Sequence, residues 1–294
     1  MLMRQPKTDK MKAMKHILVP TDFSECASTA IDFAVQSAKV MGADITLLNV
    51  FEVDVNLYTE YMGVNKQFND SLLDIARQKL RQLKSSIEEA EGVKVHTQLI
   101  RGPLKDSILL SAADWHIDLI VMGTLGASGL KEKLWGSNTA SIIESTPLPL
   151  MVVPTEYQWK HPRKILLASN HFEKKPAVLD AVFQLGQMFH ADIEVAVFTD
   201  EDDDKAITFI EQTRSTPQYE KALKEMYHVE NLKATHLYGK MLEDTLQEYI
   251  VQNDFDVLAM ITYHRNFWDQ VFHPSVTKRM SYHTSVPLLV LPMK

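Results

Sequence analysis

Glycines between residues 123 and 137 are spaced in a way that suits anion binding. Gly123, Gly126 and the pair Gly136-Ser137 come after an apolar run that ends at Met122, and before a helix-like segment that starts at Asn138. Glycine adopts positive φ freely and lets a ligand approach the backbone closely. The first N–H groups of a helix carry a partial positive charge that favours phosphate. The stretch therefore predicts a phosphate-binding loop between a strand and a helix.

The spacing of these glycines does not match the best-known phosphate loops. Neither Gly-x4-Gly-Lys-[Ser/Thr] nor Gly-x-Gly-x-x-Gly occurs in this stretch. A glycine-rich turn without a ligand is therefore an open alternative for Gly123 and Gly126. Gly129 lies within the same loop but outside the motif spacing.

The elements around this loop alternate between strand and helix. His16–Pro20 reads as a buried strand, and residues 21–25 lead into a helix whose apolar face runs to Met41, with Gly42 as its stop. Further strands are predicted at 45–50, 94–100, 118–122 and 148–153, and helices at 68–91, at 104–115 and from 138. Such alternation predicts an α/β fold with a parallel sheet that is covered by helices on both faces.

The pattern then repeats. Ile165 to His171 matches Ile17 to Phe23, 148 residues earlier, and Pro147–Pro154 matches Ser285–Pro292, 138 residues later. Agreement at both ends indicates two tandem copies of one domain. We expect a flexible leader at 1–15, a first, nucleotide-binding domain at 16–157, and a second domain at 158–294.

The second copy has lost the glycines. Ile261, His264 and Pro274 stand where the first copy has Gly123, Gly126 and Gly136, and Asn170 replaces Asp22. Branched and bulky residues disfavour positive φ, and proline lacks the N–H donor. We expect no nucleotide there. Whether that second pocket, with Asn170, His171, His264 and His273, binds anything else is left open.

Composition excludes several classes of protein. A formal net charge of −7 argues against a nucleic-acid-binding surface. No apolar run approaches the roughly 18 residues of a membrane span, and the leader lacks the apolar core of a secretory signal. Cys26 is the single cysteine, which fits a reducing cytoplasm and excludes an intrachain disulfide.

The combined motifs resemble those of the universal stress protein family. They are Pro20-Thr-Asp-Phe-Ser-Glu25, the Gly123-x2-Gly126-x9-Gly136-Ser137 spacing, and the closing Pro-Leu-x-Val-Val-Pro strand. The resemblance is close from His16 to Pro154 and degraded from Lys164 to Pro292. It implies two doubly wound, five-stranded parallel sheets with strand order 3-2-1-4-5. Open sheets of this kind bind ligands at the switch point, here between the first and fourth strands.

The resemblance also implies roles for individual residues in an ATP site, with or without Mg²⁺. The adenosine end would be lined by Pro20, Thr21 and Asp22, with the carboxylate accepting a hydrogen bond from the ribose or the base. Val50 would form an apolar wall, and Met122 and Gly123 the floor. The phosphates would be held by Gly126, Gly129, Gly136, Ser137 and Asn138.

Several of these residues have other interpretations. Asp22, with Glu25 three residues on, could instead be the N-cap of the first helix in a capping box, and Ser137 could cap the helix that it begins. Cys26 has the usual character of a small buried apolar residue. No spacing typical of a metal site is present, and Asp200–Asp204 lacks the pattern of a calcium loop.

The sequence therefore predicts a cytoplasmic, ATP-binding stress-response regulator. No catalytic constellation is found, so no catalytic residue is assigned. The fifth strands, 148–153 and 288–291, are expected to pair within one chain, since a free edge strand attracts a partner. Two such chains are expected to associate as a homodimer and to act on an unidentified protein partner. The alternatives are a slow ATPase or nucleotidyl-transfer enzyme, and a nucleotide-independent scaffold whose second domain binds another ligand.

Overall fold

The first strand and helix show how the sequence builds this fold. In the computed structural model, β1 (His16–Pro20) buries Ile17 and Val19 on one face of the sheet and Leu18 on the other. Helix α1 (Glu25–Met41) buries an apolar face, and Gly42 ends it with φ of 62°. A strand that is apolar on both faces belongs in the centre of a parallel sheet.

The structure describes residues 14–52, 64–124, 137–169, 171–201, 206–240, 242–262 and 285–293. After β1 and α1, the first half continues with β2 (Asp44–Phe51), α2 (Val64–Glu91), β3 (Val95–Arg101), α3 (Leu104–Asp114), β4 (Leu119–Gly123), α4 (Ser137–Ser145) and β5 (Leu150–Val153). The second half has β6 (Lys164–Ser169), α5 (Pro176–Phe189), β7 (Asp192–Asp200), α6 (Ala206–Tyr227), β8 (Lys233–Gly239), α7 (Leu242–Asn253), β9 (Val257–Thr262) and β10 (Leu288–Pro292).

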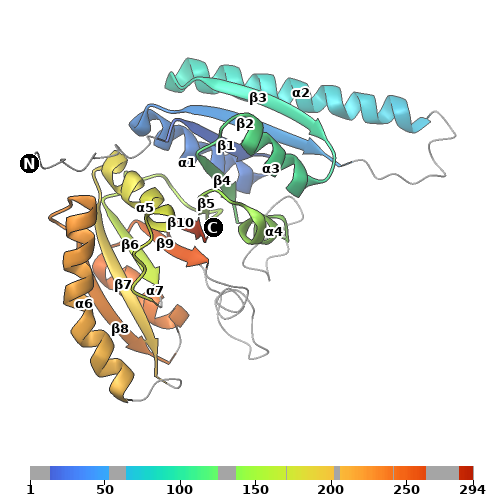
Figure 1. Cartoon of the computed structure of the whole chain (residues 1–294). Coiled ribbons are helices and arrows are strands. Elements are labelled where there is room, and N and C mark those ends of the chain that lie inside the picture. The colour runs from blue at the N-terminus through green and yellow to red at the C-terminus, as the bar shows by residue number, and fades with distance from the viewer. Residues whose placement is uncertain are drawn as a thin grey trace, which may run out of the picture.

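The ten strands of the described residues form one sheet, in the order β3-β2-β1-β4-β5-β10-β9-β6-β7-β8. The neighbours are parallel within each half, and each half has its first strand between its second and fourth. Two separate sheets were predicted. The halves instead form one sheet, because β10 pairs antiparallel with β5, with Leu289 opposite Met151. Pairing of the two fifth strands within one chain was predicted. Figure 1 shows this seam at the centre of the molecule.

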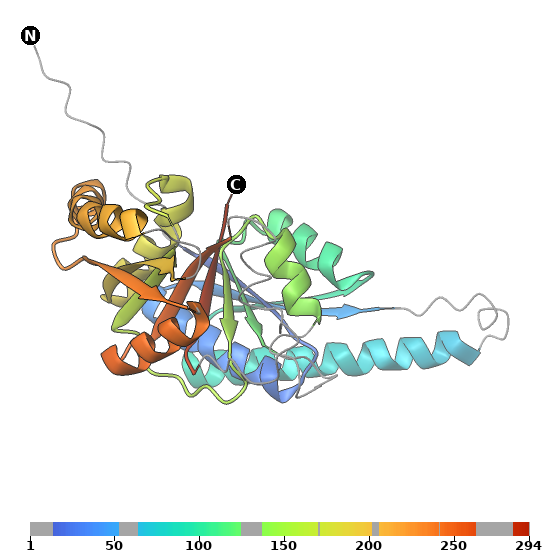
Figure 2. The same ribbon diagram turned by 90° about the horizontal axis from the view of Figure 1, so that it is seen from below.

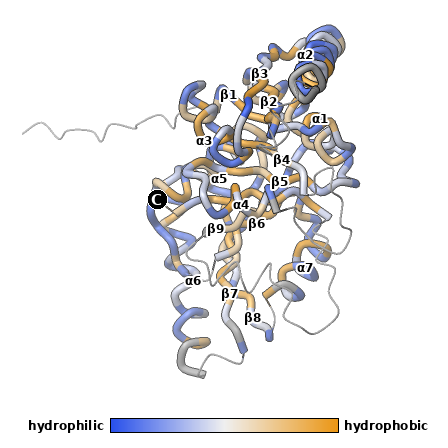
Figure 3. The backbone as a smooth tube through the Cα atoms, turned by 90° about the vertical axis from the view of Figure 1, so that its right-hand side faces the viewer, coloured by the Kyte–Doolittle hydropathy of each residue, from blue (hydrophilic) through white to orange (hydrophobic). Residues whose placement is uncertain are grey.

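The sheet separates two apolar layers that run through both halves. Helices α1, α2, α5 and α6 contribute to one layer, and α3, α4 and α7 to the other. Along β10 the side chains alternate between the layers, with Leu289 and Leu291 in the first and Leu288 and Val290 in the second. In Figure 2 the N-terminal part of α2 extends past the strands. Figure 3 shows hydrophobic colours concentrated in the strands and hydrophilic ones along α6.

The segment that connects the halves, residues 154–163, packs on the helices rather than passing free of them. Trp159 lies between Phe33 of α1 and Phe189 of α5, with ring centroids 5.2 and 6.2 Å apart. Tyr157 also contacts Phe33, at 5.9 Å, and burial raises its pKa to about 12. This connecting segment therefore contributes aromatic packing between the two halves.

One aspartate in each half fixes the start of a central strand. The Asp118 carboxylate accepts the N–H groups of Lys15 and His16, at 2.8 and 3.2 Å. In the second half, 138 residues later, Asp256 accepts those of Arg163 and Lys164, at 2.8 and 3.1 Å.

Met14, just before β1, is 3% exposed and belongs to the core. Among the described residues, no helix is both long and apolar enough to cross a membrane.

Candidate functional site

The candidate site lies where the carboxyl ends of β1 and β4 meet. Strand β1 is parallel to β2 on one side and to β4 on the other, so the chain leaves the two central strands in opposite directions. Loops that diverge in this way leave a crevice in open α/β sheets. The strands end at Pro20 and Gly123, which are the two motif ends found in the sequence.

Thr21 anchors the turn that follows β1. It is 5% exposed, and its N–H donates to the Leu48 carbonyl at 2.8 Å. The buried Asn49 side chain donates to the Thr21 carbonyl at 2.7 Å. The Thr21 hydroxyl oxygen accepts the Phe23 N–H at 3.1 Å, and Phe23 has φ of 64°. An aromatic residue rarely adopts this backbone conformation, so the hydrogen bonds hold the turn in a costly geometry.

Asp22 is not the N-cap of α1, which corrects one of the two interpretations of this residue. The helix begins at Glu25, and its N-cap is Ser24, whose hydroxyl oxygen accepts the Ala27 N–H at 3.2 Å. The Asp22 carboxylate lies two residues earlier and accepts the Ser24 N–H at 3.0 Å. Asp22 is exposed at the end of β1. A ligand contact of its carboxylate stays a prediction.

Gly123 is placed where no side chain fits. A Cβ atom at this position would lie 2.3 Å from the Cys26 sulfur and 2.7 Å from the Cys26 carbonyl oxygen. The first turn of α1 therefore packs directly on the backbone at the end of β4. The Thr139 hydroxyl of α4 donates to the Gly123 carbonyl at 2.9 Å. The beginnings of α1 and α4 thus converge on one glycine, and both helix ends carry partial positive charge.

Apolar side chains of the second layer pack beneath the ends of β2 and β4, next to the crevice. Met122 is 6% exposed and Val50 is half-buried, and both pack in the layer that contains Leu18 and Ile120. Pro20 is buried at the end of β1, in register with Leu48 of β2. The structure therefore brings together six of the predicted site residues, which are Pro20, Thr21, Asp22, Val50, Met122 and Gly123.

The predicted phosphate loop is described only at its two ends. Gly126, Gly129 and Gly136 lie outside the described residues, as does the stretch 125–136 that contains them. Ser137 is the first residue of α4, and Asn138 follows it and is exposed. Their roles toward a phosphate remain predictions.

The second half differs at the corresponding place. The Ser169 hydroxyl oxygen accepts the His171 N–H at 3.1 Å, as Thr21 does for Phe23. Helix α5, however, begins only at Pro176, which corresponds to Ser28 inside α1. Before it, the buried Glu173 carboxylate accepts the N–H groups of Lys174 and Lys175, at 2.9 and 2.8 Å. An acidic side chain thus takes up backbone donors at this helix start, which disfavours an anionic ligand.

Of the second-pocket residues named in the sequence, only His171 is described. Asn170, His264 and His273 lie outside the described residues. Ile261, where the first half has Gly123, is 1% exposed in β9. Neither the contact of Cys26 with Gly123 nor the role of Asp118 and Asp256 was predicted. The 138-residue spacing of the two aspartates is a repeat signal that would have revealed them.

Comparisons with known proteins agree with this architecture. The sequence model of the universal stress protein family matches residues 14–154. Universal stress protein MJ0531 of Methanocaldococcus jannaschii is 32% identical over 139 residues, which cover 47% of this chain and 81% of that protein. Universal stress protein MJ0577 of the same organism is 31% identical, over 47% of this chain and 94% of its own length.

A solved structure resembles nearly the whole chain. It is the crystal structure of a universal stress protein from Archaeoglobus fulgidus, with a TM-score of 0.70 and 16% identity. The match covers 95% of this chain and 98% of that chain, and at this identity it concerns the fold alone. Together with the sequence matches of the first half, these findings lead to one conclusion: the chain belongs to the universal stress protein family.

Proposed function

We propose that this protein is an ATP-binding regulator of a stress response, with the nucleotide bound at the ends of β1 and β4. The observation that carries the proposal is the convergence of the beginnings of α1 and α4 at Gly123, at the end of β4. Helix beginnings carry partial positive charge and favour a phosphate-bearing ligand. The stress-response role rests on family membership, since a fold alone does not fix a function.

Each predicted residue has a part in this proposal. The exposed Asp22 carboxylate accepts a hydrogen bond from the ribose or the base, beside Pro20 and Thr21. Val50 and Met122 supply apolar contact to the adenine. The phosphates, with or without Mg²⁺, are bound by backbone N–H groups in the motif residues Gly126, Gly129, Gly136, Ser137 and Asn138.

The second half is, in this proposal, a structural partner that binds no nucleotide. We take residues 16–157 and 158–294 as two tandem copies of one domain, because the Asp118 and Asp256 contacts recur in both. In the second copy the Glu173 carboxylate accepts the backbone N–H groups of Lys174 and Lys175 before α5, and the branched Ile261 replaces Gly123. One nucleotide per chain is therefore expected. We further propose that two chains form a homodimer and that nucleotide occupancy controls contact with a protein partner in the cytoplasm.

The first experiment measures nucleotide on freshly purified protein. The protein is denatured, and released nucleotide is identified and counted per chain. About one adenine nucleotide per chain supports the proposal, and two would show that the second half also binds. If none is found, and ATP with Mg²⁺ leaves the melting temperature unchanged, the proposal is wrong and a nucleotide-independent scaffold is favoured.

Variants of Asp22 separate ligand contact from turn formation. Asp22→Asn retains an oxygen that can accept the Ser24 N–H, whereas Asp22→Ala removes it. If the carboxylate contacts the nucleotide, both variants weaken ATP binding, by about tenfold for Asp22→Ala, which is the loss of one charge-assisted hydrogen bond. The matched control is Asn170→Ala in the second half, which should bind ATP like the wild type.

Steady phosphate release that is absent in Gly126→Val would instead support the slow ATPase.

A further inference from the structure

The second half contains a pocket near the amino end of β7, whereas the candidate nucleotide site lies at the carboxyl ends of β1 and β4. It lies between the C-terminal ends of α5 and α6 and the start of β7. The residues that matter for its chemistry are Gln187, His190, Asp192, Tyr227, Glu230 and Asn231. None of them belongs to the site at β1 and β4.

The pocket has negative electrostatic character from two independent sources. Helices α5 and α6 both end at it, each followed by a histidine in the left-handed conformation, His190 and His228 with φ of 53°. The last carbonyls of a helix carry a partial negative charge. Two exposed carboxylates, Asp192 and Glu230, add full charges. No ion pair of either carboxylate is found in the part of the chain that the structure describes. Such a pocket favours a cation.

At the corresponding position of the first half, lysine side chains of the chain itself pair with the carboxylates. At the ends of α1 and α2, Lys39 forms an ion pair with Glu91 at 2.7 Å, and Lys94 forms one with Asp44 at 2.7 Å. The Lys94 ammonium holds the pKa of Asp44 below its usual value. Two primary ammonium groups of the chain itself therefore occupy this position.

Strand register gives the matching residues in the second half. Thr46 pairs with His96, and Glu194 pairs with Lys233. Asp192 therefore corresponds to Asp44, and Asn231 to Lys94. The helix ends match Gln187 to Lys39 and Tyr227 to Glu91. From the ends of α2 and α6 to the matched strand residues His96 and Lys233, the second half is one residue longer. Both lysines have become neutral amides, while Asp192 is retained and Glu230 lies beside it.

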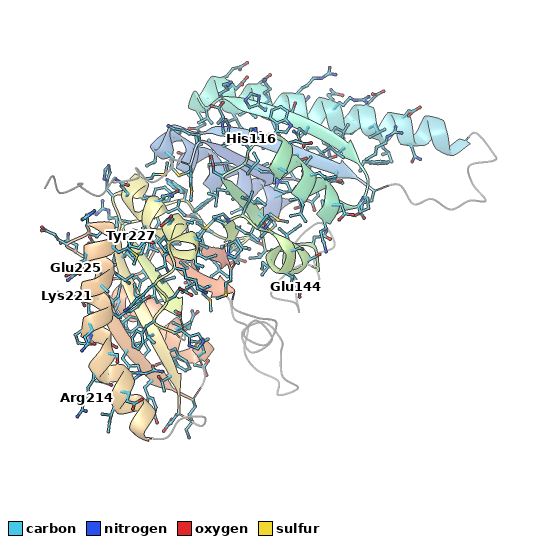
Figure 4. All side chains as sticks on the ribbon, in the orientation of Figure 1. His116, Glu144, Arg214, Lys221, Glu225 and Tyr227 are labelled. Atoms are coloured by element: carbon cyan, nitrogen blue, oxygen red, sulfur yellow. The ribbon has the colours of Figure 1, made fainter. Side chains whose placement is uncertain are left out.

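An aromatic pair adds an apolar surface to the pocket. The rings of Phe183 and Tyr227 are stacked, with centroids 3.7 Å apart and planes 6° apart. The Tyr227 hydroxyl donates to Asp180 at 3.0 Å, which fixes the ring. In Figure 4 Tyr227 lies on the side of α6 that faces the sheet, and Glu225 and Lys221 lie on its outer side. A ring surface beside carboxylates suits an alkylammonium chain.

We propose that this pocket binds a small organic cation with primary ammonium groups, that is, an alkyl diamine or polyamine. One ammonium group takes the place of Lys94 on Asp192, and the alkyl chain lies along Tyr227. A bare metal ion is less suited, because no group of three or more metal-ligating side chains is present among the described residues. The proposal is independent of nucleotide binding in the first half.

The test is calorimetric titration of the full chain with 1,5-diaminopentane at low ionic strength. We expect one diamine per chain. Asn231→Lys, which restores the lysine of the first half on an exposed position, should lower the affinity by at least about tenfold because the new ammonium group occupies Asp192. Asp192→Asn should have a similar effect. The matched control is Glu225→Gln on the outer side of α6, which changes the charge equally and should bind like the wild type.

Four results would overturn the proposal. The first is an absence of diamine binding to the wild-type chain. The second is equal binding of pentane-1,5-diol, which would remove the role of charge. The third is a loss of binding in Glu225→Gln as large as that in Asn231→Lys, which would indicate general attraction to an acidic protein. Binding of Mg²⁺ alone, with the same sensitivity to Asp192→Asn, would assign the pocket to a metal instead.

Discussion

At the scale of single residues, two glycines of the sheet and its helices differ in what surrounds them. Gly123 is confined by the backbone of Cys26, which cannot move without shifting α1. Gly186 in α5 is also close to a neighbour, but there a Cβ atom would first meet the end of the Ile193 side chain, at 2.7 Å. The first glycine is required by the packing, whereas the second is tolerated.

This difference predicts opposite effects of one added methyl group. Gly123→Ala should lower the free energy of unfolding by about 2–3 kcal/mol, because the Cβ meets a fixed carbonyl and overpacking is costly. Gly186→Ala should be within about 1 kcal/mol of the wild type or more stable, because alanine favours a helix. The corresponding residue of α1 is Ala38, which supports this expectation. Urea denaturation of the two variants measures both effects, and equal losses would contradict the assignment.

At the scale of elements, the carboxylates of Asp118 and Asp256 fix where the central strands begin. Burial raises the pKa of Asp256, but the Lys160 ammonium and the N–H groups of Arg163 and Lys164 more than offset this, so that the pKa lies below its usual value. The Lys160 nitrogen is 2.7 Å from the carboxylate. The charged form of Asp256 therefore stabilises the folded state.

We expect the contribution of Asp256 to depend on pH. At pH 7, Asp256→Ala should lower the free energy of unfolding by about 2 kcal/mol, because two backbone donors lose their acceptor. Since the pKa is lower in the folded than in the unfolded state, the contribution is complete above about pH 4 and is lost as the pH falls further. Urea denaturation between pH 7 and pH 3 should therefore show the wild type approaching the variant. Asp114→Ala, at an exposed carboxylate, is the control and should show no such convergence.

The sequence predicted the strands and their pairing better than it predicted the helix ends. A parallel strand needs continuous apolar residues, so runs such as 118–122 locate it to within a residue of Leu119–Gly123. Asp22 and Ser24 are both good N-caps, and only the three-dimensional turn distinguishes them. The closeness of Cys26 to Gly123 depends on tertiary packing and has no local signal.

At the scale of the whole molecule, the seam between β5 and β10 makes one core of two halves. Met151 and Leu289, opposite each other across it, are both 0% exposed. Trp159 adds a second connection between α1 and α5. Neither half can lose its structure without exposing apolar surface of the other.

The chain should therefore unfold in a single transition. Calorimetry should give equal calorimetric and van't Hoff enthalpies, and circular dichroism and tryptophan fluorescence should report the same urea midpoint. A ligand bound in the first half should raise the melting temperature of the entire molecule. Two resolved transitions, of which ATP shifts only one, would show instead that the halves are independent.

The covalent connection between the two halves also affects how such a protein can change over generations. In a symmetric dimer of identical chains, every substitution appears twice, so a change that ruins one site ruins both. Here a substitution enters only one half of the ten-stranded sheet. The position of Gly123 could therefore become Ile261 in the other half while the first kept its glycine. Because both halves belong to one chain, the two sites of a single sheet can acquire different functions.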